Sequence, residues 1–233
     1  MSIIEIKNVP FPNNNCNKEI SISIERGSYT TIIGKNGSGK STLLKLITGL
    51  IEYDKGEIIV SDIVMNHKNK ESIYNIRKLM GVLFQNPEYQ LIGRTVEQNI
   101  AFGLENINKS NDDMNTLIRE YSKKFDIDAI LKKSTLNLSG GEQQKVALVS
   151  AIITNPSIII LDEFTSMLDN KSKANITRIL NELKDLESIT IISITHDIDE
   201  ILNSDNVILL DNKELIFQGI PLEILSVLEE LCL

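Results

Sequence analysis

Runs of β-branched and apolar residues recur along the chain, and most end in a polar, proline-containing or glycine-containing turn. Runs bounded in this way are typical of strands. Residues 2–9 and 19–25 alternate apolar with polar positions and predict half-buried strands. Residues 80–84, 157–161 and 188–194 are mostly apolar or β-branched and predict strands covered on both faces. Further strands are expected at residues 29–33, 56–64, 206–210 and 214–218.

Helices are predicted where apolar residues recur every third or fourth position. This spacing occurs at residues 41–50, 72–78, 95–102, 113–125, 141–153, 173–186 and 221–231. Because strands and helices alternate at both ends of the chain, we expect an α/β fold with a mainly parallel sheet. The first strands precede any helix and predict a small antiparallel β-subdomain. We expect one domain, 1–233, with a core at 1–88 and 156–233 that includes this β-subdomain, and an inserted α-helical subdomain at 89–155.

Charge and composition narrow the range of partners. The 233 residues are 42% apolar and 24% charged, and the formal net charge is −8. An acidic chain lacks the surplus of Lys and Arg that nucleic-acid binding requires, so we expect no nucleic-acid partner. Cys16 and Cys232 stand far apart without a C-x-x-C spacing, which favours a reducing, cytoplasmic compartment.

Nothing in the sequence predicts direct membrane insertion. No run approaches the 18 apolar residues of a spanning helix, and residues 1–5 lack the charged and apolar regions of a signal peptide. We therefore expect any membrane association to be peripheral and to pass through a partner.

A glycine-rich loop follows the predicted strand at 29–33 and precedes a predicted helix. It matches G-x-x-x-x-G-K-[ST], in which backbone amides and a helix N-terminus hold phosphate oxygens. Lys40 would reach the β- and γ-phosphates, and the Ser41 hydroxyl would hold Mg²⁺. The alternative is an ordinary glycine turn before a helix. The residues expected to bind nucleotide are Gly34, Lys35, Asn36, Gly37, Ser38, Gly39, Lys40, Ser41 and Thr42.

Two acids and one imidazole lie at the ends of predicted core strands. Asp162 is expected to hold Mg²⁺, and Glu163 to orient or deprotonate the water that attacks the γ-phosphorus. His196 could hydrogen-bond the γ-phosphate. The alternatives are two solvated acids that cap a strand, and a structural histidine.

Two further polar groups are candidates because of their neighbours. Gln85 ends the strand at 80–84 and could offer its amide oxygen to Mg²⁺ or to the attacking water; it could also be a plain strand terminator. Ser139, Gly140 and Gly141 open a predicted helix and form a second anion-binding arrangement, which could also be a simple helix cap. Its simplest use is to bind the γ-phosphate of ATP held by another copy.

Together these motifs resemble those of ATP-binding-cassette (ABC) ATPases. In the order of that family, GKNGSGKST resembles the Walker A loop, FQNPE the Q-loop, LSGGEQQKVAL the signature, IIILDE Walker B, SMLD the D-loop and ITHD the histidine switch. The resemblance covers essentially the whole chain and implies a P-loop NTPase (RecA-like) core that hydrolyses ATP to ADP and phosphate.

The resemblance also implies partners. A second ABC ATPase subunit, identical or not, would complete each site in a head-to-tail dimer that sandwiches ATP between residues 34–42 of one copy and 139–141 of the other. Integral membrane transporter subunits would dock near the Q-loop, which puts the chain at the cytoplasmic face of the cell membrane. Phe11 resembles the aromatic residue that stacks on adenine, usually a tyrosine; it could also anchor its loop in the core.

A narrower resemblance points to the ATPases of energy-coupling-factor (ECF) transporters, which import vitamins or transition-metal ions. It rests on residues 84–106, FQNPEYQLIGRTVEQNIAFGLEN, and on DEFTSMLD. Glu142 and Lys145 depart from the glutamine and arginine frequent in the signature helix, and many such ATPases are longer. The alternatives are the ATPase of another ABC importer or exporter, a soluble ABC protein acting on ribosomes or DNA, and a P-loop kinase.

Overall fold

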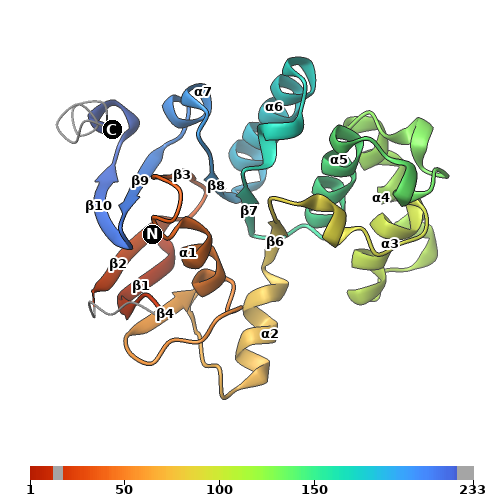
Figure 1. Cartoon of the computed structure of the whole chain (residues 1–233). Coiled ribbons are helices and arrows are strands. Elements are labelled where there is room, and N and C mark those ends of the chain that lie inside the picture. Colours follow the sequence, from red (N-terminus) through yellow and green to blue (C-terminus); the bar gives the residue numbers. More distant parts are fainter. Residues whose placement is uncertain (13–17, 225–233) are drawn as a thin grey trace.

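The computed structural model describes residues 1–12 and 18–224 (Figure 1). The strands are β1 Ser2–Pro10, β2 Glu19–Glu25, β3 Tyr29–Ile33, β4 Glu57–Val60, β5 Ile63–Val64, β6 Met80–Leu83, β7 Ile158–Asp162, β8 Thr190–Ile194, β9 Asn206–Asp211 and β10 Glu214–Gly219. The helices are α1 Lys40–Ile47, α2 Lys70–Lys78, α3 Val96–Asn106, α4 Asn111–Lys124, α5 Gly140–Ile152, α6 Asn170–Glu187 and α7 Ile198–Leu202. Short 3₁₀ turns are η1 Pro87–Gln90, η2 Asp128–Ile130, η3 Thr135–Asn137 and η4 Phe164–Met167. Most of the helix predicted at 221–231, part of the loop expected at 10–17, and both cysteines lie outside the described residues.

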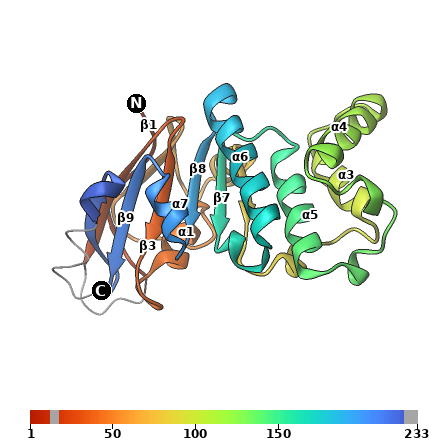
Figure 2. The same ribbon diagram turned by 90° about the horizontal axis from the view of Figure 1, so that it is seen from above.

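Two sheets form the framework. The larger has the strand order β10-β9-β3-β8-β7-β6, in which only the β9–β10 hairpin pairs antiparallel. The smaller has the order β2-β1-β4-β5 and is antiparallel throughout. These sheets confirm the predicted α/β class with a mainly parallel core and a small antiparallel part. Figure 2 shows α6 on one face of the larger sheet, with α5 and then α3 and α4 beyond it.

Strands β7 and β8 of the larger sheet supply apolar side chains to two separate cores. Ile159, Leu161 and Ile191 belong to the core under α5 and α6. Ile158 and Ile192 point to the opposite face and pack with α1 and the antiparallel sheet. Because side chains alternate along a strand, a run of consecutive apolar residues is needed to serve both faces. This requirement accounts for the sequence IIILD of β7.

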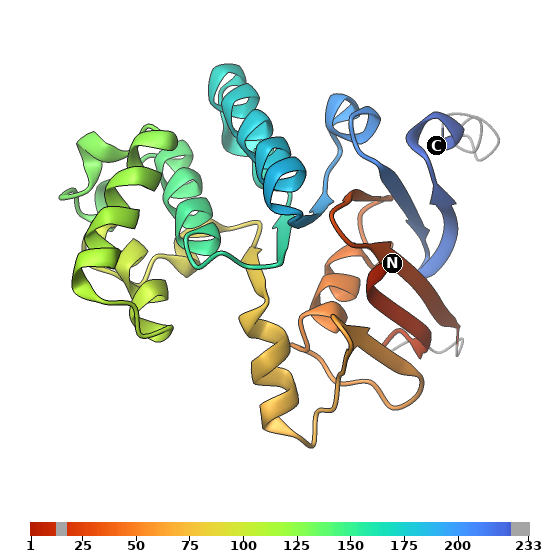
Figure 3. The same cartoon turned by 180° about the vertical axis from the view of Figure 1, so that it is seen from behind.

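The helical segment stands beside the larger sheet. Figures 1 and 3 show α3, α4 and α5 grouped together, reached from β6 through η1 and left again through β7. Buried side chains of α3 and α5, such as Ile100 and Val149, share one core with the sheet-facing residues of β7. The division of the chain after residues 88 and 155 stays a prediction. No helix within residues 1–12 and 18–224 is long and apolar enough to cross a membrane.

One local prediction was wrong, and one element was missed. The run 56–64 is a hairpin of β4 and β5, because Ser61 and Asp62 both adopt positive φ (47° and 66°) and reverse the chain. Helix α7 was not predicted. Its N-cap Asp197 accepts a hydrogen bond from the backbone N–H of Glu200, so a helix start follows the histidine motif directly.

Candidate functional site

Strand register brings four loops to one edge of the larger sheet. Ile194 of β8 pairs with Ile32 of β3 on one side and with Asp162 of β7 on the other, and Leu83 of β6 pairs with Leu161. All four strands are parallel, so the residues that follow them emerge together. Those residues are Gly34, Gln85, Glu163 and His196. The structure therefore brings the predicted strand-end groups together at this edge.

The glycine-rich loop needs glycine at two places for steric reasons. A Cβ on Gly34, which has φ 147°, would lie 2.1 Å from the carbonyl oxygen of Leu210. Gly39 has φ 109° and is the N-cap of α1. The Lys40 ammonium curls back and donates hydrogen bonds to the carbonyl oxygens of Gly34 (2.7 Å) and Lys35 (3.1 Å). The buried hydroxyl of Ser38 has no hydrogen-bond partner among the described residues, as expected of a loop shaped to receive a polar group.

Burial disfavours the charged forms of two side chains near the loop, Lys40 and Asp162. Burial lowers the pKa of Lys40, although the nearby negative charges of Glu163 and Asp162 act in the opposite direction. Burial, followed by the charge of Glu163, raises the pKa of Asp162, which also shares a hydrogen bond with the Ser41 side chain. Hydroxyl and carboxylate oxygens at this point are the ligand type that Mg²⁺ prefers. Ser41 and Asp162 could therefore hold that ion, and Gln85 could add an amide oxygen.

Glu163 lies between Gln85 and His196. It adopts a left-handed conformation (φ 49°, ψ 35°), and its backbone N–H donates to the Ile194 carbonyl (3.0 Å). The Gln85 amide nitrogen donates to one carboxylate oxygen (2.6 Å), and His196 Nε2 lies 3.4 Å from the other. Left-handed backbone is unfavourable for a residue other than glycine, and such strain concentrates at functional sites. This arrangement could orient a water molecule beside the carboxylate.

Ser139 caps α5 through a reciprocal pair of hydrogen bonds. Its hydroxyl accepts from the Glu142 backbone N–H (3.3 Å), and the Glu142 carboxylate accepts from the Ser139 backbone N–H (2.7 Å). The latter bond, aided by an ion pair with Lys133, lowers the pKa of Glu142. Glu142, noted as a departure from the usual glutamine, therefore completes a capping box.

The Ser139 cap is not part of the same cluster as the glycine-rich loop. Figures 1 and 2 place α5, which begins at Gly140, and α1 on opposite sides of β7. The hydrogen bonds described for Ser139 join it to Glu142 and not to residues 34–42, and the use of this cap by a second copy stays a prediction.

Phe11 requires a correction. Its ring is 2% exposed and packs in the core shared by the antiparallel sheet and α1, where a Cβ added to Gly39 would lie 3.1 Å from it. A ring buried in this way presents no face to a base. The structure therefore favours the role of a core anchor over the predicted stacking on adenine.

Sequence reasoning missed the polar groups that connect these turns. Glu200 is buried on α7 and accepts hydrogen bonds from the hydroxyls of Tyr29, Ser193 and Thr165. Lys173 of α6 pairs with Asp197, the residue after His196. The D-x-x-E spacing of Asp197 and Glu200 is the one signal that could have indicated a helix start there.

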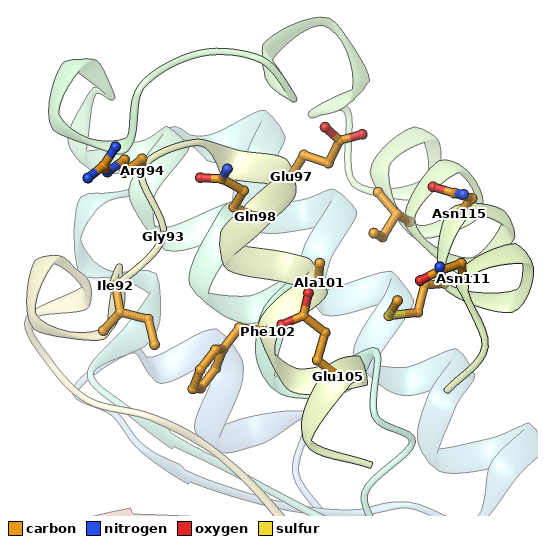
Figure 4. A pocket seen from close by; sticks show the side chains of 12 residues that line it. Ile92, Gly93, Arg94, Glu97, Gln98, Ala101, Phe102, Glu105, Asn111 and Asn115 are labelled. Atoms are coloured by element: carbon orange, nitrogen blue, oxygen red, sulfur yellow. The ribbon is translucent and has the colours of Figure 1, made fainter. Parts of the chain in front are cut away.

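A hollow lies in the helical segment that follows Gln85. It has a volume of about 840 Å³ and opens between α3 and α4 (Figure 4). Its lining combines acidic side chains, Glu97 and Glu105, with apolar ones such as Ile92 and Phe102. Ile92 is 63% exposed, and Tyr89, in the preceding η1 turn, is 83% exposed. Apolar side chains gathered on a surface are typical of protein contacts.

The chain is similar to known proteins over most of its length. A family model described as ABC transporter matches residues 17–166. The chain is 46% identical over 228 residues to the energy-coupling factor transporter ATP-binding protein EcfA1 of Mycoplasma capricolum, which covers 96% of this chain and 55% of that protein. It is 40% identical over 230 residues to the energy-coupling factor transporter ATP-binding protein EcfA of Pediococcus pentosaceus, which covers 97% and 81%. The chain thus spans about half the length of some curated relatives, 55% of the M. capricolum protein and 50% of its Mycoplasma mycoides counterpart.

Solved structures agree in fold. The structure of cbiO1 from Clostridium perfringens, part of the ABC transporter complex cbiONQ, matches with a TM-score of 0.86 at 30% identity, over 98% of this chain and 94% of that chain. The dimeric ATP-binding cassette MJ0796, in a post-hydrolysis state bound to ADP and Pi, matches with a TM-score of 0.83 at 26% identity, over 94% and 98%.

Proposed function

Because this chain belongs to the ABC transporter family of ATP-binding cassettes, we propose that it binds ATP with Mg²⁺ and hydrolyses ATP to ADP and phosphate as the energy-supplying subunit of a membrane transporter. The observation that carries this proposal is the Glu163 carboxylate, held between Gln85 and His196 beside the glycine-rich loop. A carboxylate so placed can take a proton from water as its oxygen attacks the γ-phosphorus.

Each group at the sheet edge has a distinct role in this proposal. Backbone amides of residues 34–42 and the start of α1 hold the phosphates. Lys40 would exchange its carbonyl partners in the loop for phosphate oxygens, and Ser41 and Asp162 would hold Mg²⁺, which would neutralise phosphate charge. His196 would orient the γ-phosphate, and Gln85, which donates to Glu163, could add its amide oxygen to the ion.

The site is completed by a second copy or a close relative. In the proposed head-to-tail dimer, Ser139 and the glycines after it cover the γ-phosphate bound by residues 34–42 of the partner. The separation of α5 from α1 within one chain supports this arrangement. Hydrolysis would then release the two subunits from one another.

Membrane subunits are proposed to dock over the hollow between α3 and α4. The exposed side chains of Tyr89 and Ile92 lie a few residues after Gln85, so a docked segment would be connected to the nucleotide through this short turn. The chain would in this way act peripherally at the cytoplasmic face of the membrane.

The relatives favour an ECF-type importer of a vitamin or transition-metal ion over another ABC importer or exporter. Relatives that are 40–46% identical to this chain are energy-coupling factor transporter ATP-binding proteins. Affinity purification from native membranes would decide this point, because the co-purifying membrane proteins define the transporter class. If the co-purifying membrane proteins were those of an exporter, the ECF assignment would be overturned and the ATPase assignment would remain.

The ATPase proposal is tested with Glu163→Gln, which keeps the size of the side chain and removes its basicity. Phosphate release with Mg-ATP is expected to fall at least a hundredfold, the usual contribution of a general base. Glu182→Gln, on the solvent side of α6, is the matched control and should leave the rate unchanged. Undiminished turnover in Glu163→Gln would remove Glu163 from its proposed role.

A further inference from the structure

Glu200 is a buried carboxylate that accepts only hydroxyl donors within the described part of the chain. It is 6% exposed and accepts hydrogen bonds from Tyr29 Oη (2.8 Å), Ser193 Oγ (2.5 Å) and Thr165 Oγ1 (3.5 Å). Burial first, and then the charge of Glu200, raises the pKa of the Tyr29 phenol well above its usual range. Carboxylates are rarely buried without a cation because their desolvation is costly. The burial of the Glu200 carboxylate therefore needs an explanation other than core packing.

Its partners join two turns that carry the proposed reacting side chains. One turn follows β7 and runs from Glu163 into α6, and the other follows β8 and runs from His196 into α7. Thr165 lies in the first turn and Glu200 at the end of the second. A second contact joins the same two turns, because Lys173 at the start of α6 forms an ion pair with Asp197.

The β7–β8 ladder sets the distance between the starts of these turns, because Asp162 pairs with Ile194 there. Beyond the strand ends a cavity of about 340 Å³ lies between the turns, bordered by Glu163, Lys173, His196 and Asp197. Side chains that border a cavity are packed less tightly than those in a core. The polar contacts between the turns, Lys173–Asp197 and Thr165–Glu200, therefore add to the ladder in fixing the 3.4 Å separation of Glu163 and His196.

We propose that Asp197 and Glu200 are positioning residues: by holding Lys173 and Thr165, they fix the turn after β8 to the turn after β7 and so keep His196 facing Glu163. This inference rests on the proposed roles of Glu163 and His196. One carboxylate oxygen of Asp197 pairs with the Lys173 ammonium, and the other accepts a hydrogen bond from the Glu200 backbone N–H. The ion pair is therefore joined to the start of α7. Neither residue touches substrate in this scheme.

The test removes both links while sparing the carboxylates. In the full chain, the double variant Thr165→Val and Lys173→Met keeps side-chain volume and is expected to lower kcat about tenfold, with the KM for ATP changed less than twofold, because small displacements of reacting groups affect rate more than binding. Tyr29→Phe removes a Glu200 hydrogen bond that does not join the two turns, and should leave kcat within twofold. Lys173→Arg should restore most of the loss caused by Lys173→Met.

A second readout needs no turnover. The chain has two histidines, so the imidazole NMR resonances of His196 can be followed at fixed pH against those of His67. The double variant should shift the His196 signals alone, and Tyr29→Phe should not. Unchanged kcat and His196 signals in the double variant, or an equal loss in Tyr29→Phe, would overturn the inference. If Glu163→Gln also retained turnover, the assignment of Glu163 would fail instead, so the two failures are distinguishable.

Discussion

Asp162 is a residue whose charge opposes the stability of the nucleotide-free fold. Burial and the charge of Glu163 raise its pKa. A carboxyl with a raised folded pKa is most stabilising below its unfolded pKa of about 3.9, where it is protonated in both states, and stability is lost as pH rises through the folded value. The ionised carboxylate therefore lowers the stability of the nucleotide-free fold, and a bound cation would offset that loss.

Asp162→Asn should therefore stabilise the nucleotide-free protein. Without an ionisable group, we expect a melting temperature about 2 °C higher at pH 7.5, with the difference shrinking towards pH 4. The same variant should lose the additional thermal stabilisation that Mg²⁺ gives in the presence of ATP. Asp54→Asn, at an exposed position, is the control and should change neither quantity. A lower melting temperature for nucleotide-free Asp162→Asn would contradict the electrostatic reading.

At the scale of elements, the capping box of α5 makes a separate contribution to stability. Ser139→Ala removes the hydroxyl that accepts from the Glu142 backbone N–H and should cost about 1 kcal/mol in the free energy of unfolding measured with urea. Ser110→Ala removes the equivalent bond at the start of α4 and should cost a similar amount. A negligible cost in Ser139→Ala alone would indicate that Glu142 and Lys133 hold this helix start without the hydroxyl.

Sequence patterns predicted elements well where local chemistry and tertiary context agree. The β-branched run of β3 was bounded correctly because a buried strand begins and ends with it. The hairpin at Ser61 and Asp62 was missed because neither residue signals positive φ as strongly as Asn-Gly does. The burial of Phe11 was not predicted because it depends on packing with α1 and the antiparallel sheet, which the local sequence does not show.

The site was predicted as a set of residues but not as a set of contacts. Motifs at strand ends identified Glu163, Gln85 and His196, since parallel strands gather their carboxyl ends at one edge. The bonds between them depend on strand order, with β8 between β3 and β7, and this order is not encoded locally. For the same reason Glu200, whose donors come from three different elements, could not be assigned in advance.

At the scale of the whole molecule, the decisive prediction concerns assembly. With Mg-ATP, the hydrolysis-deficient Glu163→Gln protein should sediment as a dimer in analytical ultracentrifugation, and without nucleotide as a monomer. Adding Ser139→Arg should abolish the dimer while ATP binding, measured by calorimetry, is unchanged, because a large cation would obstruct the γ-phosphate across the interface. Ser110→Arg, at the start of α4, should leave the dimer intact. Persistence of the dimer in the Ser139→Arg protein would show that the α5 cap is not at the interface.

The burial and register of strand β8 limit which sequence changes the chain can tolerate. Its five residues are all buried, and Ile194 is in register with strands on both sides. One extra residue inserted here would rotate every later side chain of the strand to the opposite core and move the histidine turn by about 3.3 Å. Length variation among natural or engineered homologues should therefore be found in the surface turns, and this five-residue strand should keep its length.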